Sequence, residues 1–493
     1  MNSKWRKVVL GSALGLLVAG GLAGCAGLSG DSSKKDAASG DSDVPTLLMY
    51  QIGDKPDNYD ELMKIANKKI KEKAGVQLNL QYMGWGDYEQ KMAVITSSGE
   101  NYDIALAKNY VTNAQKGAYA DLTELAPKEA KEAYDMLDPA YIKGNLIDGK
   151  LYAFPVNANV FGEQMITFNK QFLDKYNLDI SNVKTYQDLG PLFKVIKEKE
   201  ANTIAFAAGK GFKVESNMDY PVTNGMPFAV DLLGDETKII NQYNNERLQK
   251  DLKTMNDYYK AGYIAQDAAT SNTDHPLEGT TWFARQETQG PYDYGDTILT
   301  TAAGQPLESK AVTMPVKTTG QAQMANFVIS SNSKNKEKSM EVLGLINSDS
   351  ELLNGLVYGI EDKAWEKVGD NRVKLLDGYL PKEHMSAWNT GNNKILYVPE
   401  SITDEQVAER DKKIEESTAS PILGFNFNTK TVKSEMTNIA NVMNQYIDGL
   451  NTGTLDPEKA IPEMNEKLEK AGMAKVQAEM QKQYDDFRKE SKE

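Results

Sequence analysis

The sequence predicts an α/β protein with two lobes and additional helices at its C-terminal end. From residue 45 to residue 347, short apolar segments typical of strands alternate with segments of helical periodicity, which is the pattern of α/β folds. The roughly 450 residues after the N-terminal region are too many for a single hydrophobic core. From Thr431 onward, the periodicity is helical throughout.

The first elements form a strand, helix and strand. Residues 46–52 are a short apolar run, and four apolar residues then recur at helical spacing: Leu62, Ile65, Ala66 and Ile70. We expect Gly75 to cap this helix. Residues 76–82 alternate apolar and polar residues, as a strand with one covered face does. Because a crossover through a helix joins parallel strands, these two strands should run parallel.

The alternation continues along the chain, and each lobe should therefore hold a mostly parallel sheet. The predicted helices are residues 88–96, 171–176, 186–199, 247–262 and 336–347, and the predicted strands are 103–107, 151–156, 163–169, 202–209, 311–317 and 324–331. Two apolar stripes mark the C-terminal helices, from Val432 to Leu450 and from Met473 to Phe487. Packing on the body explains both stripes, and a partner-binding helix pair is the alternative.

The N-terminal residues have the order of an export signal. Lys4, Arg6 and Lys7 precede an apolar run of about 16 residues, which is shorter than the roughly 20 that a membrane span needs. Residues 1–24 are therefore predicted to be a signal peptide. The run ends in Leu-Ala-Gly-Cys, which resembles the lipobox of bacterial lipoproteins, and Cys25 is the only cysteine. We expect Cys25 to be lipidated, with a buried free thiol as the alternative, and residues 25–44 to include a flexible tether.

Composition disfavours several other classes of protein. The net charge is −14 and no basic block follows the signal, so neither nucleic acid nor an anionic lipid surface is an expected partner. The only histidines, His275 and His384, stand in polar surroundings without a metal or triad motif, and no cofactor or metal is predicted. A glycosidase needs only two carboxylates, and the 70 acidic residues leave that alternative open.

Several phrases occur in a fixed order between residues 45 and 355: YDIALAKNYVTNAQKGAYADLTEL, DGKLYAFPVNANVFGEQMITFNK, TYQDLGPLFKVIKEK, FARQETQGPYDY and SSNSKNKEKSMEVLGLINSDSELLN. As a set they resemble the extracellular solute-binding proteins of carbohydrate ABC transporters (family 1), which include maltose-binding protein. The later phrases LVYGIEDKAWEKVG, SAWNTGNN and SPILGFNFNTKTVKSEM resemble the LipO-like subgroup, which has an extra C-terminal domain.

The resemblance implies that the chain adopts a two-lobed, hinge-connected fold like that of periplasmic binding proteins. The implied N-terminal lobe comprises residues 45–110 and about 320–385, and the C-terminal lobe 111–319 and about 386–493, with hinges near 108–112, 315–325 and 380–390. It also implies a monomer anchored on the extracellular side of the cell membrane, which delivers an oligosaccharide to the permease of an ABC importer. The subgroup includes streptococcal N-glycan-binding lipoproteins, so an N-glycan-derived sugar is the implied ligand. A surface glycoside hydrolase or a glycan adhesin is the alternative.

Sugar sites combine aromatic rings for stacking with carboxylates and amides for hydrogen bonds. The chain has 24 tyrosines and 5 tryptophans, and ligands of open α/β sheets bind beyond the carboxyl ends of strands. The candidate ligand-binding residues that follow strands in the first lobe are Tyr50, Asp54, Lys55, Trp85, Asp87, Tyr88 and Tyr110. Those from later segments are Asn157, Asn159, Trp282, Tyr292 and Trp388.

Two positions depart from the family pattern. Tyr292 stands where the family has a tryptophan, and Arg285 where it has a glycine, so the aromatic content of the cleft is not transferable from the family. Trp282 fits a core position equally well.

Overall fold

The computed structural model describes residues 44–271, 275–380 and 382–490. The described residues form one compact unit. The predicted signal peptide, Cys25 and nearly all of the predicted tether lie outside the described residues. In the part of the chain that the structure describes, no helix combines the length and apolar character needed to cross a membrane.

The first sheet has the strand order β2-β1-β3-β15-β6. Its strands are β1 (Thr46–Ile52), β2 (Gln77–Met83), β3 (Ile104–Leu106), β6 (Ala153–Pro155) and β15 (Asn326–Ile329). Strand β1 runs parallel to β2 and β3, which confirms the predicted unit, whereas β15 is antiparallel to β3 and to β6. Gly75 caps the intervening helix as predicted, with φ +69° and its N–H bonded to the carbonyl of Lys71.

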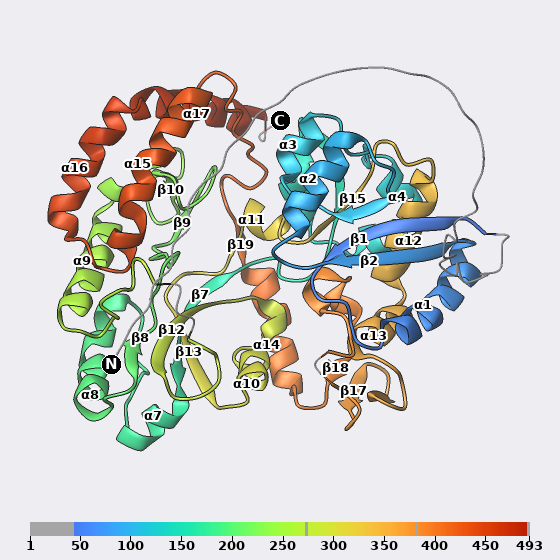
Figure 1. The fold of residues 1–493 in the computed structure, drawn as a ribbon, viewed down its shortest axis with the longest axis horizontal. Coiled ribbons are helices and arrows are strands. Elements are labelled where there is room, and N and C mark those ends of the chain that lie inside the picture. Colours follow the sequence, from blue (N-terminus) through green and yellow to red (C-terminus); the bar gives the residue numbers. More distant parts are fainter. Residues whose placement is uncertain (1–43, 272–274, 381, 491–493) are drawn as a thin grey trace, which may run out of the picture. The chain divides into compact units, whose positions relative to one another are not determined.

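Helices cover this sheet, with α1, α12 and α13 together on one side and α2 on the other (Figure 1). The helices of this lobe are α1 (Tyr59–Ala74), α2 (Tyr88–Ser98), α3 (Tyr110–Gln115), α4 (Leu125–Glu129), α5 (Lys131–Asp135), α6 (Pro139–Asn145), α12 (Lys336–Ser348) and α13 (Ser350–Tyr358).

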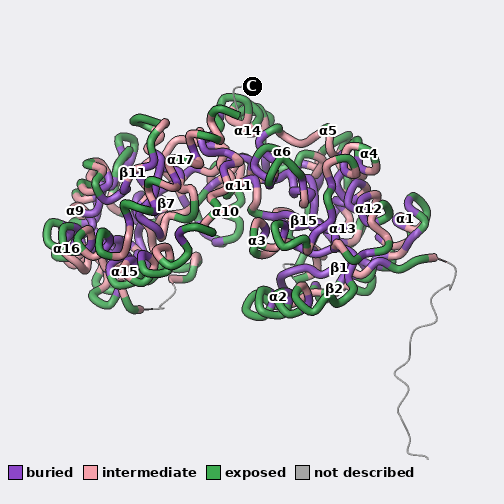
Figure 2. Tube along the Cα trace, turned by 90° about the horizontal axis from the view of Figure 1, so that it is seen from above, coloured by how far each residue is buried: buried purple, intermediate pink, exposed green. Residues whose placement is uncertain are grey.

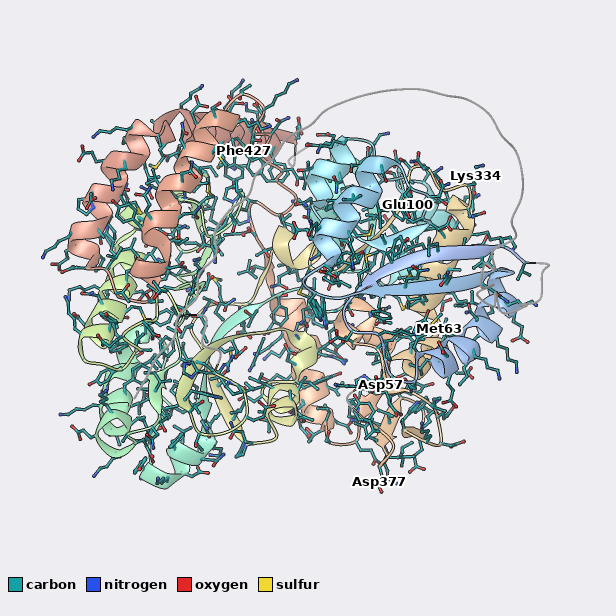
Figure 3. All side chains as sticks on the ribbon, viewed as in Figure 1. Asp57, Met63, Glu100, Lys334, Asp377 and Phe427 are labelled. Atoms are coloured by element: carbon teal, nitrogen blue, oxygen red, sulfur yellow. The ribbon has the colours of Figure 1, made fainter. Side chains whose placement is uncertain are left out.

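The apolar stripe of α1 differs from the prediction at one position. Ile65 is 53% exposed, and Met63, labelled in Figure 3, is buried in its place. At 3.6 residues per turn, Ile65 lies about 115° from the centre of the face formed by Leu62, Met63, Ala66 and Ile70.

The second sheet has the order β13-β7-β12-β8. Its strands are β7 (Glu163–Asn169), β8 (Ile204–Phe206), β12 (Trp282–Gln289) and β13 (Leu307–Ala311). Strand β7 is antiparallel to both β12 and β13, and only β12 and β8 run parallel. The prediction of a mostly parallel sheet is wrong for this lobe. Periodicity shows which faces of a strand are covered, but it does not show the direction in which the chain enters the sheet.

Besides short 3-10 helices, the described residues contain further short strands and α-helices. The strands are β4 (Leu146–Ile147), β5 (Lys150–Leu151), β9 (Met218–Asp219), β10 (Phe228–Asp231), β11 (Ile240–Asn241), β14 (Val316–Lys317), β16 (Trp365–Val368), β17 (Arg372–Leu375), β18 (Val398–Pro399) and β19 (Thr418–Ala419). The helices are α7 (Lys170–Tyr176), α8 (Gly190–Lys199), α9 (Glu246–Lys260), α10 (Thr297–Ala303), α11 (Thr319–Ala322), α14 (Asp404–Glu416), α15 (Lys433–Asn451), α16 (Pro457–Lys470) and α17 (Met473–Glu490). The strand expected over residues 311–317 is interrupted between β13 and β14.

The C-terminal helices pack on the second lobe, as the favoured interpretation predicts. In Figure 1, α15 and α16 lie beside α9, and α17 packs against α15 and α16. The apolar residues of these helices belong to the same core as α9. Ile439, Met443, Val476 and Met480 are each at most 1% exposed. Figure 2 shows the burial of each residue along the chain, and buried and exposed positions alternate on these helices.

Two large cores define the lobes. The first contains buried residues between Leu47 and Ala158 and between Ala325 and Met385, and the second contains residues between Ile166 and Ala284 and between Ile422 and Tyr484. The segment 111–158, expected in the C-terminal lobe, thus packs in the first core. The reason is β6, which adds to the first sheet beside β15 before the chain leaves. The last crossing follows Tyr397, which packs on the first core, and so comes later than residues 380–390.

The connections between the cores lie side by side. A small apolar cluster joins the three connections and includes Tyr141 of α6. Phe161 lies in the first connection, after β6, Ala322 in the second, before β15, and Leu423 in the third, after β19. Strands β14 and β19 pair in parallel, joining the second and third connections. The amide nitrogen of the Asn145 side chain donates to the carbonyl of Ala322 over 2.9 Å. The three connections between the cores therefore contact one another at a single place, which we call the junction.

Candidate functional site

The topology brings one edge of each sheet to the junction. Strands β1, β2, β3 and β6 all end at the same edge of the first sheet, because β6 and β3 are both antiparallel to β15. In the second sheet, β8, β12 and β13 end at the edge where β7 begins. Residues 156–162 and 312–325 connect these two edges directly. Side chains that follow these strand ends are therefore candidates for a shared site.

At the edge of the first sheet, two tryptophans form a stack. Trp85 and Trp388 have ring centroids 6.1 Å apart and an interplanar angle of 22°. Trp85 is 54% exposed although it is a large apolar side chain. Gly53 lies against it, since a Cβ there would be 3.6 Å from the indole ring, and its φ of +124° favours glycine. The exposed indole offers a face on which the CH groups of a sugar ring can stack.

Three charged candidates lie near this stack at the surface. Asp54 and Lys55 are exposed, and the Lys55 ammonium lies 4.2 Å from the centre of the Tyr59 ring. Asp87 is also exposed and pairs with Lys91 over 2.9 Å. Solvent-exposed pairs of this kind are weak, so these side chains can turn to a ligand at little cost.

The predicted tyrosines of this lobe are buried. The Tyr88 hydroxyl donates to the carbonyl of Leu106 over 2.7 Å, and the Tyr110 hydroxyl donates to the carbonyl of Asn145 over 2.7 Å. Tyr50 is 6% exposed. Burial raises the pKa of each of these phenols. These three rings thus tie the strand ends to their surroundings and offer almost no surface to a ligand in this arrangement.

Two candidates from the later segments are also buried. The indole N–H of Trp282 donates to the carbonyl of Pro276 over 2.9 Å, and its ring is 0% exposed. This placement agrees with the core position that the sequence allowed. The Asn157 amide donates to the carbonyl of Met136 over 3.1 Å. Both side chains stabilise the protein interior in this arrangement.

Asn159 and Tyr292 lie at the edge of the second sheet. The Asn159 side chain packs directly on Gly290, where a Cβ would come within 2.2 Å of its amide carbon. Its amide oxygen is buried without a hydrogen-bond partner among the described residues. The guanidinium of Arg410 lies 5.2 Å from the centre of the Tyr292 ring, and burial raises the pKa of Tyr292. Tyr292 is thus held by a cation–π contact from α14.

Helix α14 also shapes a cavity of about 480 Å³ beside Tyr292. Arg410 donates to the Tyr294 hydroxyl over 2.7 Å, and the Gln406 side chain donates to the carbonyl of Tyr294 over 3.1 Å. Tyr294 has φ +51°, a conformation that a tyrosine adopts only when its surroundings hold it. Across the cavity, Lys413 pairs with Glu163 over 3.0 Å. The third connection thus fixes the aromatic segment after β12.

A second cavity, of about 410 Å³, lies at the same sheet edge and was not predicted. Residues 215–224 supply much of its lining, including Glu215, Asn217 and Tyr220, and Met314 comes from the connection after β13. Burial raises the pKa of Glu215 to about 7. These residues follow the carboxyl end of β8, so the rule applied to the first three strands would have found them. Neither cavity is lined by the first-lobe candidates.

The described residues contain no group of three or more His, Cys, Asp or Glu side chains that could hold a metal ion. His384 stacks on Tyr379, with ring centroids 4.6 Å apart. The arrangement as a whole is an aromatic stack at one sheet edge and amide and carboxylate groups at the other. Such an arrangement suits a polyhydroxylated ligand that is held by stacking and hydrogen bonds.

Comparison with known families agrees with this arrangement. Residues 66–352 match the bacterial extracellular solute-binding proteins, and residues 421–489 match a domain of unknown function (DUF3502). The chain belongs to the bacterial extracellular solute-binding proteins. The two-lobed fold and the family that the sequence phrases indicate are both confirmed.

Individual relatives narrow the class further. A carbohydrate ABC transporter substrate-binding protein of Streptococcus pneumoniae is 55% identical over 491 residues, which is 99% of each chain. The crystal structure of the N-glycan transport solute binding protein (NgtS) from Streptococcus pneumoniae is 56% identical, covers 90% of this chain and 99% of its own, and superposes with a TM-score of 0.88. This protein is accordingly the substrate-binding protein of a carbohydrate ABC transporter, facing the outside of the cell.

The fold extends to distant proteins. An extracellular solute-binding protein from Bifidobacterium longum subsp. infantis is only 15% identical, yet it covers 90% of this chain and 98% of its own with a TM-score of 0.61. This likeness concerns the fold alone.

Proposed function

We propose that this protein captures N-glycan-derived oligosaccharides that contain mannose and N-acetylglucosamine. The observation that carries the proposal is the 56% identity to the pneumococcal N-glycan transport protein, whose solved complexes contain Man1GlcNAc and Man5GlcNAc. An identity this high over 90% of the chain favours a shared class of ligand. The chemistry of the two sheet edges agrees with it, since stacking rings and amide groups suit sugars.

In this proposal the sugar lies between the two edges. Trp85 and Trp388 stack on one part of it from the first lobe, with Asp54 beside them. Asn159, Tyr292 and the cavity next to β8 contact it from the second lobe. The aromatic stack is the part of the site with the clearest support, because Trp85 keeps 54% of its surface exposed while it stacks on Trp388.

Closure of the lobes on the sugar is the proposed mechanism. The connections between the cores lie together at one junction, where a small change of angle moves one lobe relative to the other. The pneumococcal structure whose name includes no ligand superposes with a TM-score of 0.88, and the two sugar complexes with 0.82 and 0.78. A change of lobe angle would produce such a decrease. A ligand that contacts both lobes favours the closed form by its differential affinity.

The proposed location is the outer face of the cell membrane, with the lipid on Cys25 as anchor. The charged, apolar and small-residue order of residues 1–25 supports this, although these residues lie outside the described ones. The closed, loaded protein then docks on the membrane permease. Cys25→Ser should release the protein into the medium of growing cells, and mass spectrometry of the mature N-terminus would show whether the wild type carries a lipid.

We further propose that the sugar passes unchanged, so the protein is not a glycoside hydrolase. The decisive test is calorimetry of residues 44–493 with mannosyl-N-acetylglucosamine oligosaccharides, with chromatography of the sugar recovered from the same sample. Saturable binding with intact sugar supports the proposal, and malto- and fructo-oligosaccharides are the matched controls. New reducing ends would instead establish a surface hydrolase. Binding to whole N-glycoproteins but not to free glycans would favour an adhesin.

A further inference from the structure

The cavity of about 410 Å³ beside β8 presents hydrogen-bond donors that no protein group uses. The side-chain oxygen of Asn217 accepts from the backbone N–H of Met314 over 2.8 Å. This bond fixes which end of the amide is oxygen. Its two N–H groups have no partner among the described residues, and they are left for whatever enters the cavity.

The backbone holds Asn217 firmly in place. Its φ is +51°, a left-handed conformation that asparagine tolerates better than most residues. Its carbonyl accepts from the backbone N–H of Leu232 over 3.1 Å. The amide donors are thus positioned in advance, which reduces the entropy lost when a ligand binds.

A carboxylate in the same cavity supplies the complementary acceptor. One oxygen of Glu215 accepts from the Asn224 side chain over 2.9 Å. No cation forms an ion pair with it within the described residues, because nearby Lys213 lies against Asp448, 3.8 Å away. The second oxygen of Glu215 is therefore available to a ligand donor.

Apolar side chains line the cavity next to these polar groups. Val222 is 44% exposed, which is unusual for a valine in a folded chain, and Met314 is half-buried. Sugar hydroxyls alone make no use of such a surface. A ligand with a methyl group beside an amide would use all three kinds of group.

We propose, on the basis of the function proposed above, that this cavity binds the 2-acetamido group of N-acetylglucosamine. The acetamido carbonyl accepts from the Asn217 amide, its N–H donates to Glu215, and its methyl group lies on Val222 and Met314. N-acetylglucosamine is a component of both sugars named in the pneumococcal complexes. A site built for these bonds rejects a sugar that lacks the group, because its own polar atoms are then left unpaired.

The test compares two disaccharides of the same linkage by calorimetry: mannosyl-N-acetylglucosamine and mannosyl-glucose. In the wild type we expect the first to bind about 10–100-fold more tightly. Asn217→Asp keeps the acceptor for the Met314 N–H but removes the donors. A sugar hydroxyl can donate to the new carboxylate, whereas the acetamido carbonyl cannot. The preference should therefore fall to roughly threefold or less.

Two further variants serve as control and as a second test. Asn177→Asp changes an exposed asparagine that also has φ +50° and lies on the same lobe, so it should leave both affinities unchanged. Val222→Thr replaces an exposed methyl by a hydroxyl at nearly equal volume, and should lower the preference by about two- to fivefold even if Asn217→Asp fails to fold.

The outcomes separate this inference from the function on which it rests. If the wild type binds neither disaccharide, the proposed function fails. If the wild type prefers the acetamido sugar but Asn217→Asp and Val222→Thr weaken both sugars equally or not at all, the function stands and the acetamido site is overturned.

Discussion

The two sheet edges differ in chemistry, although the same topological rule places both at the junction. The edge of the first sheet offers the Trp85–Trp388 stack with exposed carboxylate and ammonium groups around it. The edge of the second sheet offers cavities lined by amides, carboxylates and tyrosines. One edge is therefore suited to stack on a sugar ring, and the other to read its substituents.

This difference suggests that the first lobe contributes mainly to the affinity for sugars and the second lobe mainly to the selectivity among them. Stacking on an indole depends on apolar area and tolerates many sugars, whereas a positioned amide or carboxylate discriminates between ligands that differ in one group. Changes at the first edge should thus weaken all ligands alike. Changes at the second edge should alter the preference among them.

The largest expected effect on binding comes from Trp85→Ala. Loss of this half-exposed ring should weaken the binding of every sugar ligand by about 1–3 kcal/mol, because an indole of the stack no longer covers the sugar. Calorimetry with the two disaccharides measures this effect. Ile65→Ala is the control, since Ile65 is similarly exposed but lies on α1, away from the sheet edge. An unchanged affinity in Trp85→Ala would remove the aromatic stack from the site.

Gly290→Ala should affect the second edge through packing. The new methyl group would come within 2.2 Å of the Asn159 amide carbon, so this side chain or the backbone must move. We expect a loss of about 1–3 kcal/mol in the free energy of unfolding, measured by urea denaturation, together with weaker sugar binding. Gly209→Ala is the control for introducing a methyl group on this lobe, because Gly209 has no positive φ and the nearest atom to a Cβ there would be the carbonyl oxygen of Ser271, at 3.9 Å.

Arg410→Ala tests whether α14 holds the aromatic segment after β12. The Tyr292 and Tyr294 rings would lose a cation–π partner, and Tyr294 would lose a hydrogen bond. A decrease of about 0.5–1 kcal/mol in sugar affinity should follow, and Arg410→Lys should restore only part of it. Lys412→Ala, an exposed position on the same helix, should have no effect. Equal affinities in all of these proteins would show that α14 does not position the site.

The smallest expected effect is the change of stability with pH. It is small because Glu215 is partly exposed to the cavity, where solvent weakens the effect of burial on its charge. Its pKa is raised by burial from 4.5 to about 7, with Lys213 and Asp219 as charged neighbours. Between about pH 4.5 and 7 the unfolded chain releases this proton while the folded chain keeps it, so stability falls as pH rises. Asp293, with a pKa of about 6, acts in the same direction. Thermal unfolding of Glu215→Gln should therefore show a shallower decrease over this window than the wild type, and identical pH profiles would contradict this account.

The sequence predicts the first edge better than the second. Strands β1, β2 and β3 are followed directly by Trp85 and the other first-lobe candidates, so periodicity and the carboxyl-end rule are sufficient to find this region. They do not reveal that Tyr88 and Tyr110 turn inward, because the direction of a ring at a strand end depends on acceptors far along the chain, such as the carbonyl of Asn145.

The second edge depends on tertiary structure that the sequence does not display. Its strands run antiparallel to β7, and the beginning of one strand therefore lies beside the ends of others. The carboxyl-end rule reaches Asn217 through β8, but the rule does not show that its amide oxygen is bonded to Met314, nearly one hundred residues away, at the wall of a cavity. The packing of residues 111–158 in the first core likewise depends on pairing between β6 and β15, which no local pattern encodes.

The central claim is that one sugar contacts both edges and draws the lobes together. Small-angle X-ray scattering of residues 44–493, with and without saturating mannosyl-N-acetylglucosamine disaccharide, tests it most directly. We predict a smaller radius of gyration with the sugar, a smaller decrease in the Trp85→Ala protein at the same sugar concentration, and no change with a fructo-oligosaccharide. Saturable binding of the disaccharide with an unchanged radius of gyration would contradict a site shared between the two lobes.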